Sequence, residues 1–174
     1  MNPPAAFTIT YWGTTGTFPN PLLPSEVTDK LVGALRHFVE GGHLEHLRPG
    51  PGLDDSMRAL LAAELPFHLR STYGGNTTCI EVQTPDALIV IDCGSGCREL
   101  GIALESRWKA EGDSARRTAH VLLSHSHMDH TFSTPFFAPY YNRANSLSVW
   151  GPKMAIDSLA AVLNPASAMS QVFF

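Results

Sequence analysis

The chain has 174 residues, of which 44% are hydrophobic and 16% charged, and its formal net charge is -4. This length fits one domain with a sizeable core, and the composition is typical of soluble globular proteins. The negative charge argues against a nucleic-acid partner. No apolar run reaches the roughly 18 residues of a membrane span, so no membrane partner is predicted.

The N-terminus and the cysteines predict the cellular location. Residues 1–4 lack the charged and apolar regions of a signal peptide. Three cysteines are an odd number without a disulfide framework, which fits a reducing compartment. We therefore predict a cytoplasmic protein. Cys93 and Cys97 could form half of a metal site, but packing near a turn is the favoured interpretation because no second pair follows.

The first predicted element is a strand over Phe7–Trp12, where β-branched and aromatic residues alternate with others. It leads into a Gly/Thr loop, Gly13–Pro19. Taken alone, this loop is either a plain turn or a way to bring backbone N–H groups close to an anionic ligand.

Residues 24–70 are predicted to form an inserted helical hairpin. Apolar residues from Val27 to Phe38 recur at helical spacing, and Gly41-Gly42 ends the first helix. Asp54 or Asp55 is expected to cap a second helix that ends at Pro66. The spacing of the histidines in this segment matches no metal pattern; they are His37, His43, His46 and His68. The hairpin could be a lid or an oligomer contact.

A β-hairpin and a helix follow. One alternating strand, Cys79–Gln83, is joined by a Pro-Asp turn to a continuously apolar strand, 87–91, expected to be buried on both faces. Ser95 is expected to cap a helix whose apolar stripe, Cys97, Leu100, Leu104 and Trp108, covers the sheet.

The pattern with the clearest chemistry follows the next apolar run, Val121–Leu123, which predicts a buried strand. Within residues 120–130, the strand ends in His125-Ser126-His127-Met128-Asp129-His130. Imidazole and carboxylate are ligands of zinc, manganese and iron. Alternate residues of extended chain share a face, so His125 and His127 can reach one ion, and Asp129 and His130 a second. The spacing predicts a metal centre with two divalent ions, zinc first, with manganese or iron as alternatives.

Beyond this loop the pattern is mixed. Residues 132–141 are strongly aromatic, which favours core packing beneath the ligand loop over a platform on which substrate stacks. A strand is predicted over 146–150 and a helix over 154–163. Strands that alternate with helices indicate an α/β layered domain.

The ligand loop resembles the signature of the metallo-β-lactamase-fold hydrolase superfamily. Three further stretches are similar to that superfamily: G-T-x-G-x-x-P at 13–19, Y-G-G-N-T at 73–77 and I-D-x-G-x-G at 91–96. The first two resemble its phosphodiesterase and transfer-RNA-processing branch. The resemblance implies an αββα layered sandwich. It also implies that Asp92 supports the ligand loop from behind and that Gly74, Gly75 and Asn76 lie on the substrate side. For Asn76, turning the loop is an equally good interpretation.

The resemblance also implies a function. Two ions would share and deprotonate a water, and Asp129 would orient the bridging hydroxide and accept its proton. The expected substrate is a small-molecule phosphodiester or related ester. The alternative is a non-catalytic module, truncated or regulatory, that retains partial metal binding.

The number of ligands limits this prediction. Two ions need roughly five to seven ligands, and the loop supplies four. After His130 the chain has no histidine, and its only acid is Asp157. We therefore expect residues 1–174 to be a partial domain that carries the first half of the sandwich. Because a half-sandwich exposes an apolar sheet face, we expect self-association, a homo-oligomer or a partner half.

Overall fold

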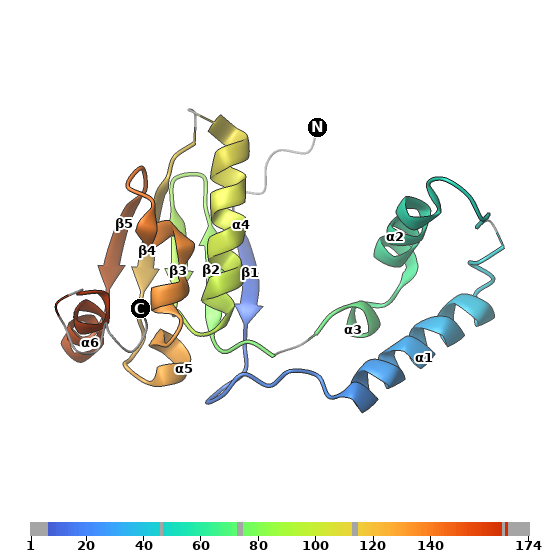
Figure 1. Cartoon of the computed structure of the whole chain (residues 1–174), viewed down its shortest axis with the longest axis horizontal. Helices are drawn as coiled ribbons and strands as arrows, with labels where there is room; N and C mark the ends of the chain where they lie inside the picture. The colour runs from blue at the N-terminus through green and yellow to red at the C-terminus, as the bar shows by residue number, and fades with distance from the viewer. Residues whose placement is uncertain (1–6, 46, 73–74, 113–114, 165, 167–174) are drawn as a thin grey trace. The chain divides into compact units, whose positions relative to one another are not determined.

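The computed structural model of the chain describes residues 7–45, 47–72, 75–112, 115–164 and 166. The chain divides into two compact units (Figure 1). We call residues 1–20 and 74–174 the sheet unit, and residues 21–73 the helical unit.

The sheet unit contains one five-stranded mixed sheet in the order β1-β2-β3-β4-β5. The strands are β1 (Thr8–Gly13), β2 (Cys79–Gln83), β3 (Leu88–Ile91), β4 (Thr118–Leu122) and β5 (Ser146–Trp150). β1, β2 and β3 are joined by antiparallel pairing, whereas β3, β4 and β5 run parallel. Parallel neighbours need a crossover between them. The first crossover is helix α4 (Gly96–Glu111), and the second contains α5 (Met128–Thr131), η2 (Thr134–Phe136) and η3 (Ala138–Tyr141). Helix α6 (Lys153–Leu163) follows β5. The predicted α/β class and hairpin are confirmed.

The core lies between the sheet and α4. Cys97, Leu100, Leu104 and Trp108 are all buried on α4, as the helical stripe predicts. They pack with Val90, Val121 and Phe137 in one continuous cluster. One charged group is buried on the same side: the carboxylate of Glu81, 2% exposed, accepts from Trp12 Nε1 at 2.9 Å and Arg107 Nη2 at 2.6 Å. Because the buried charge is paired and hydrogen-bonded, it is compatible with the core.

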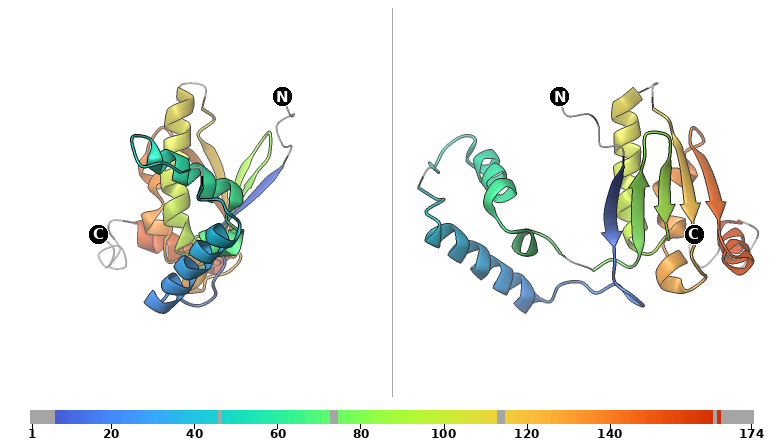
Figure 2. Two further views of the ribbon diagram at one scale, coloured as in Figure 1. Left: turned by 90° about the vertical axis from the view of Figure 1, so that its right-hand side faces the viewer. Right: turned by 180° about the vertical axis from the view of Figure 1, so that it is seen from behind.

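The opposite face of the sheet is apolar and partly open. One row of apolar residues crosses all five strands through the observed pairing; it consists of Tyr11, Ile80, Ile91, Leu122 and Trp150. Tyr11 is 65% and Trp150 60% exposed. Seen from behind, no described helix of this unit lies across the face (Figure 2). A contiguous apolar patch of this kind favours an interaction. The self-association expected from the sequence stays a prediction, which sedimentation of the chain would test.

This open face corrects two details of the sequence analysis. Strand β3 is not buried on both faces: Leu88 and Val90 are buried, but Ile89 and Ile91 are only half-buried. Similarly, Leu122 is 37% exposed within the run that was expected to be a buried strand. A continuous apolar sequence hides the alternation, because both faces are apolar and only one is covered.

The helical unit consists of α1 (Pro24–Glu40), α2 (Leu53–Glu64) and α3 (Phe67–Arg70). The first helix ends at the predicted glycines, with Gly41 as its C-cap. The expected Asp54 or Asp55 cap is wrong: α2 begins after Gly52, whose φ of 85° is left-handed, and the two aspartates lie in the first turn. There their charge complements the helix dipole. Within the described residues, no helix is both long enough and apolar enough to cross a membrane.

The histidines of the helical unit show no sign of metal binding among the described residues. His37 stacks on His43 with ring centroids 5.5 Å apart, and its Nε2 contacts the carbonyl oxygen of Glu64 at 3.0 Å. The side chain of His68 is exposed. His46 lies outside the described residues.

Candidate metal centre

The sheet topology brings three distant segments to one end of the sheet. β1, β3, β4 and β5 all point the same way, so the loops after them leave from a common edge. The loop after β1 contains Thr17, the turn after β3 contains Asp92, and the segment after β4 contains the predicted ligands. The backbone joins the last two, because Cys93 N donates to His130 O at 2.7 Å and Ser133 N to Cys93 O at 3.1 Å. The carboxyl ends of strands are where α/β sheets place their sites.

Asp92 is the anchor of the ligand loop. Its side chain is almost fully buried and accepts from the backbone N–H of Ser124 at 2.7 Å and from Ser124 Oγ at 2.8 Å. Its Oδ2 also lies 2.7 Å from Nδ1 of His130. The backbone of Asp92 has a φ of 61°, in the left-handed region that is uncommon outside glycine. Such strain persists where the surroundings impose it, and it concentrates at functional sites.

The hydrogen bonds around Asp92 fix the tautomers of two histidines. A carboxylate only accepts, so Nδ1 of His130 carries the proton that it shares with Asp92. The hydroxyl of Ser124 gives its proton to Asp92, and its oxygen therefore accepts from Nδ1 of His125 at 2.9 Å. In the neutral form of each ring, this leaves the lone pair on Nε2. A histidine held in this way by a carboxylate or hydroxyl has the tautomer that a metal ligand needs.

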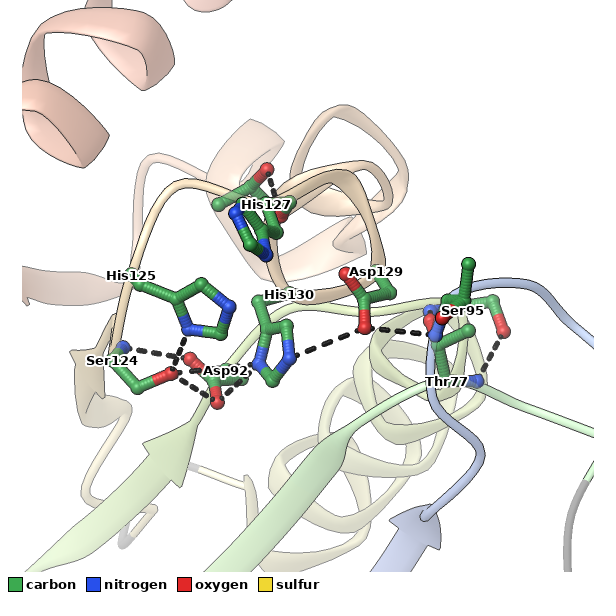
Figure 3. Close-up of polar contacts among 10 residues, drawn as sticks. Thr77, Asp92, Ser95, Ser124, His125, His127, Asp129 and His130 are labelled. Carbon is green, nitrogen blue, oxygen red and sulfur yellow. Dashed lines mark hydrogen bonds and ion pairs between the residues drawn. The ribbon is translucent and has the colours of Figure 1, made fainter.

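The three histidine rings gather above the sheet edge (Figure 3). The ring centroids of His125 and His130 are 4.0 Å apart, and those of His125 and His127 are 4.6 Å apart. His125 therefore lies close both to His127, its expected partner at the first ion, and to His130, which was expected at the second ion. His127 is exposed.

Asp129 is held by the loop after β1. Its Oδ2 accepts from the backbone N–H of Thr17 at 2.9 Å and lies 3.3 Å from Nε2 of His130. The Thr17 N–H lowers the pKa of Asp129 below its ordinary value of 3.8; burial opposes this, while its own backbone N–H, His130 and His125 add to it. Asp129 is thus kept ionised. The Gly/Thr loop does bring a backbone N–H to an anion, and that anion is a side chain of the same chain.

The four predicted ligands are of the chemical types that bind zinc, but they are not arranged around one ion position. His125, His127, Asp129 and His130 supply nitrogen and oxygen donors, which suit zinc, manganese and iron. Yet among the residues that the structure describes, no group of three or more His, Cys, Asp or Glu is arranged to hold a metal ion. The side chains gather at one end of the sheet without surrounding a common ion position.

The predicted substrate-side residues have local roles in the structure. The carbonyl oxygen of Asn76 accepts from the N–H groups of Thr14 and Thr15, and its side-chain oxygen accepts from Ser95 Oγ at 2.9 Å. These bonds tie the loop after β1 to the turn before α4. Gly75 has a φ of 101° and donates to Thr15 Oγ1. Gly74 lies outside the described residues.

Ser95 occupies the N-cap position of α4 but does not cap it. Its hydroxyl accepts from Thr77 N at 2.9 Å, and its own N–H donates to Thr77 Oγ1 at 2.8 Å. This reciprocal pair replaces the expected side-chain cap, which α4 lacks. The Ser95 hydroxyl thus joins the turn before α4 to the segment before β2 and does not cap the helix.

The cysteines belong to the core. Cys79, Cys93 and Cys97 are all free and buried, and each is 0% exposed. Burial raises the pKa of the Cys97 thiol well above 9.0, and the neighbouring Cys79 and Cys93 thiols add to this. The packing interpretation of Cys93 and Cys97 fits this arrangement, and Cys79 joins them from β2.

Two residues of the site carry no signal that the sequence analysis used. Ser124 bridges Asp92 and His125, and Thr17 holds Asp129. The position of Ser124, between the apolar strand and the first ligand, could have indicated a residue that supports the ligand loop. Thr17 lies 112 positions away from Asp129, so only the fold brings them together.

The comparisons with known proteins agree with this geometry. Residues 72–142 match the family model described as Metallo-beta-lactamase superfamily. This span holds Asp92 and the four predicted metal ligands of the loop. Members of that superfamily are mostly metal-dependent hydrolases. Neither the search of curated proteins nor that of solved structures found a match.

Proposed function

We propose that the chain belongs to a metal-dependent hydrolase of phosphodiester or related ester bonds. His125 and His127 would bind one divalent ion, and Asp129 and His130 a second, with zinc as the first choice. When bound, such a pair of ions would activate water and stabilise the charge that develops on the substrate. The ligand loop would supply part of the ligand set.

One observation carries the proposal: Asp92 and Ser124 engage Nδ1 of both His130 and His125, so that Nε2 is the nitrogen left for a metal ion on each ring. Nε2 of His130 faces the ionised carboxylate of Asp129 at 3.3 Å. A neutral imidazole would turn its Nε2 lone pair toward this carboxylate, and a positive charge on Nε2, from a proton or a bound metal ion, relieves the repulsion.

The chain's own residues have distinct tasks in this proposal. Asp92 and Ser124 orient the imidazoles, and Thr17 holds the carboxylate of Asp129. Asp129 would also accept a proton, and its side chain is 15% exposed and therefore reachable from solvent. The order of the strand ends provides the rigid frame for these groups.

The test is a zinc titration by calorimetry combined with an assay on bis(p-nitrophenyl) phosphate. We expect up to about two zinc ions per chain. His130→Ala should weaken binding strongly, whereas the control His68→Ala should bind like the native chain, because His68 lies exposed in the helical unit. A native chain that takes up no zinc would refute the proposal.

A second function is favoured by the unassembled donor set among the described residues. The chain would then be a non-catalytic module that binds metal weakly. Zinc uptake that depends on His130 but brings no phosphodiester hydrolysis, at any zinc concentration, would select this alternative.

A further inference from the structure

A small cavity opens directly beside Asp129. It measures about 80 Å³ and is lined by Thr17, Phe18, Pro19, Thr77, Ser95, Met128, Asp129 and Phe132. The residues come from three segments that are distant in sequence: the loop after β1, the turn between β3 and α4 with its partner Thr77, and the ligand loop. All of them belong to the sheet unit.

Besides its apolar side chains, the lining includes Asp129 and three hydroxyl residues, Thr17, Thr77 and Ser95. Three of the large apolar side chains are exposed: Phe18 by 70%, Met128 by 63% and Phe132 by 45%. The hydroxyls of Thr77 and Ser95 accept from each other's backbone N–H groups, and that of Ser95 also donates to Asn76. Figure 3 shows Asp129 between His130 and the Thr77–Ser95 pair. The cavity therefore offers mainly apolar contact, and two of its three hydroxyls are already hydrogen-bonded.

Phe18 is presented by a strained turn. Its N–H donates to Gly16 O at 2.8 Å, so Thr17 is the central residue of a three-residue turn, with a φ of 68°. Turns of this kind are rare and strained. The same turn directs the N–H of Thr17 to Asp129 and the ring of Phe18 to the cavity. Strain that persists beside a site favours a ligand contact.

We propose that this cavity binds a flat aromatic group of the substrate, on the side of the reacting bond nearest Asp129. The inference rests on the proposed function and names its substrate class: aryl or heteroaryl esters and phosphodiesters. The two rings and the thioether favour a flat ring through stacked and edge contacts. The cavity is smaller than the roughly 150 Å³ that encloses benzene completely, so the ring would remain partly open to solvent. A long aliphatic chain would extend beyond it.

The test compares two phosphonates that are not hydrolysed, phenylphosphonate and methylphosphonate. Both are titrated by calorimetry into the zinc-loaded chain. Burial of about 60 Å² of ring surface, at roughly 25 cal/mol per Å², corresponds to about tenfold tighter binding of the phenyl compound. Phe18→Ala and Phe132→Ala should each remove most of this preference and leave methylphosphonate binding unchanged. Phe7→Ala is the matched control, because Phe7 is 56% exposed and does not line the cavity.

The outcomes separate this inference from the proposed function. Since Phe18 is 70% exposed, its loss does not threaten folding. If zinc and methylphosphonate bind but the phenyl ring adds nothing, the cavity inference is wrong and the proposed function stands. A phenyl preference that survives both Phe18→Ala and Phe132→Ala overturns it as well. If zinc does not bind, the proposed function is wrong and the inference is lost with it.

Discussion

Two helices of similar length, α4 and α1, show how differently the two units are held together. Helix α4 has 16 residues and buries six of them. Helix α1 has 17 residues and buries only Phe38. The apolar stripe of α1 is largely exposed: Val27 by 42%, Leu31 by 60% and Leu35 by 63%.

The two helices show that an apolar stripe in the sequence does not by itself mean that the stripe is buried. Both helices have apolar residues at helical spacing, and both were predicted from it. Packing of an apolar face, more than helix propensity, stabilises a helix in a protein. α4 packs on the sheet within its own unit, whereas α1 presents an apolar stripe without comparable burial in the helical unit.

The largest expected effect on the free energy of unfolding is seen when one leucine of α4 is compared with one leucine of α1. Leu104 is 1% exposed and Leu35 63% exposed. Leu104→Ala should lower the free energy of unfolding by about 2–5 kcal/mol, the cost of a core cavity. Leu35→Ala should change it by about 0.5 kcal/mol or less. Urea denaturation of the two variants measures both. A comparable loss in Leu35→Ala would mean that α1 is buried in solution, by a second copy or another surface.

Two glycines of the sheet unit give the next comparison. A Cβ at Gly94 would lie 2.2 Å from the carbonyl oxygen of Asp129 and 2.4 Å from Thr77 Oγ1, whereas one at Gly16 would meet nothing within 4 Å. Gly94→Ala should therefore displace the ligand loop and lower stability by about 1–3 kcal/mol, the usual cost of overpacking. Gly16→Ala should leave thermal unfolding nearly unchanged. Equal melting temperatures for the two variants would contradict the close approach at Gly94.

Asp92→Asn tests the support of the ligand loop. Asn tolerates the left-handed backbone of Asp92, so folding should be retained. The amide weakens the hydrogen bonds to Ser124 and His130, and zinc affinity should fall by about 10–100-fold, as for other residues that orient metal-bound histidines. Asp86→Asn in the exposed turn before β3 is the control. Calorimetric affinities that match for both variants would remove Asp92 from the site.

The smallest expected effect is a loss of stability at alkaline pH. It arises in the sheet unit, which contains all three cysteines. Burial raises the pKa of Cys97 well above 9.0 and also raises the pKa of Tyr140. The folded chain therefore keeps protons that the unfolded chain releases. The contribution to stability is complete below pH 9 and is lost as the pH rises beyond it, by at most about 1.4 kcal/mol per pH unit for each proton. Urea midpoints from pH 8 to 10.5 measure this, and Cys97→Ala should flatten the profile.

Much of the sheet unit follows from local sequence. The hairpin at residues 79–91, helix α4 and its buried stripe, and the strand before the ligand loop were all predicted from apolar spacing and turn residues. The expectation that β3 is buried on both faces was wrong, because the sequence does not show which face of the sheet is covered by helices. Ile89 and Ile91 have the same chemistry as Leu88 and Val90, and only the choice of which sheet face the helices cover decides which pair is buried.

The sequence by itself determined the donor types of the candidate centre, because His125, His127, Asp129 and His130 lie within one short segment and need no fold to be recognised together. Tertiary structure alone decided how they are held. Asp92 lies 38 positions before His130 and Thr17 lies 112 positions before Asp129, and they meet because four strands point to one edge of the sheet. Local patterns encode chemistry and periodicity, but hydrogen bonds over such separations depend on strand order and register.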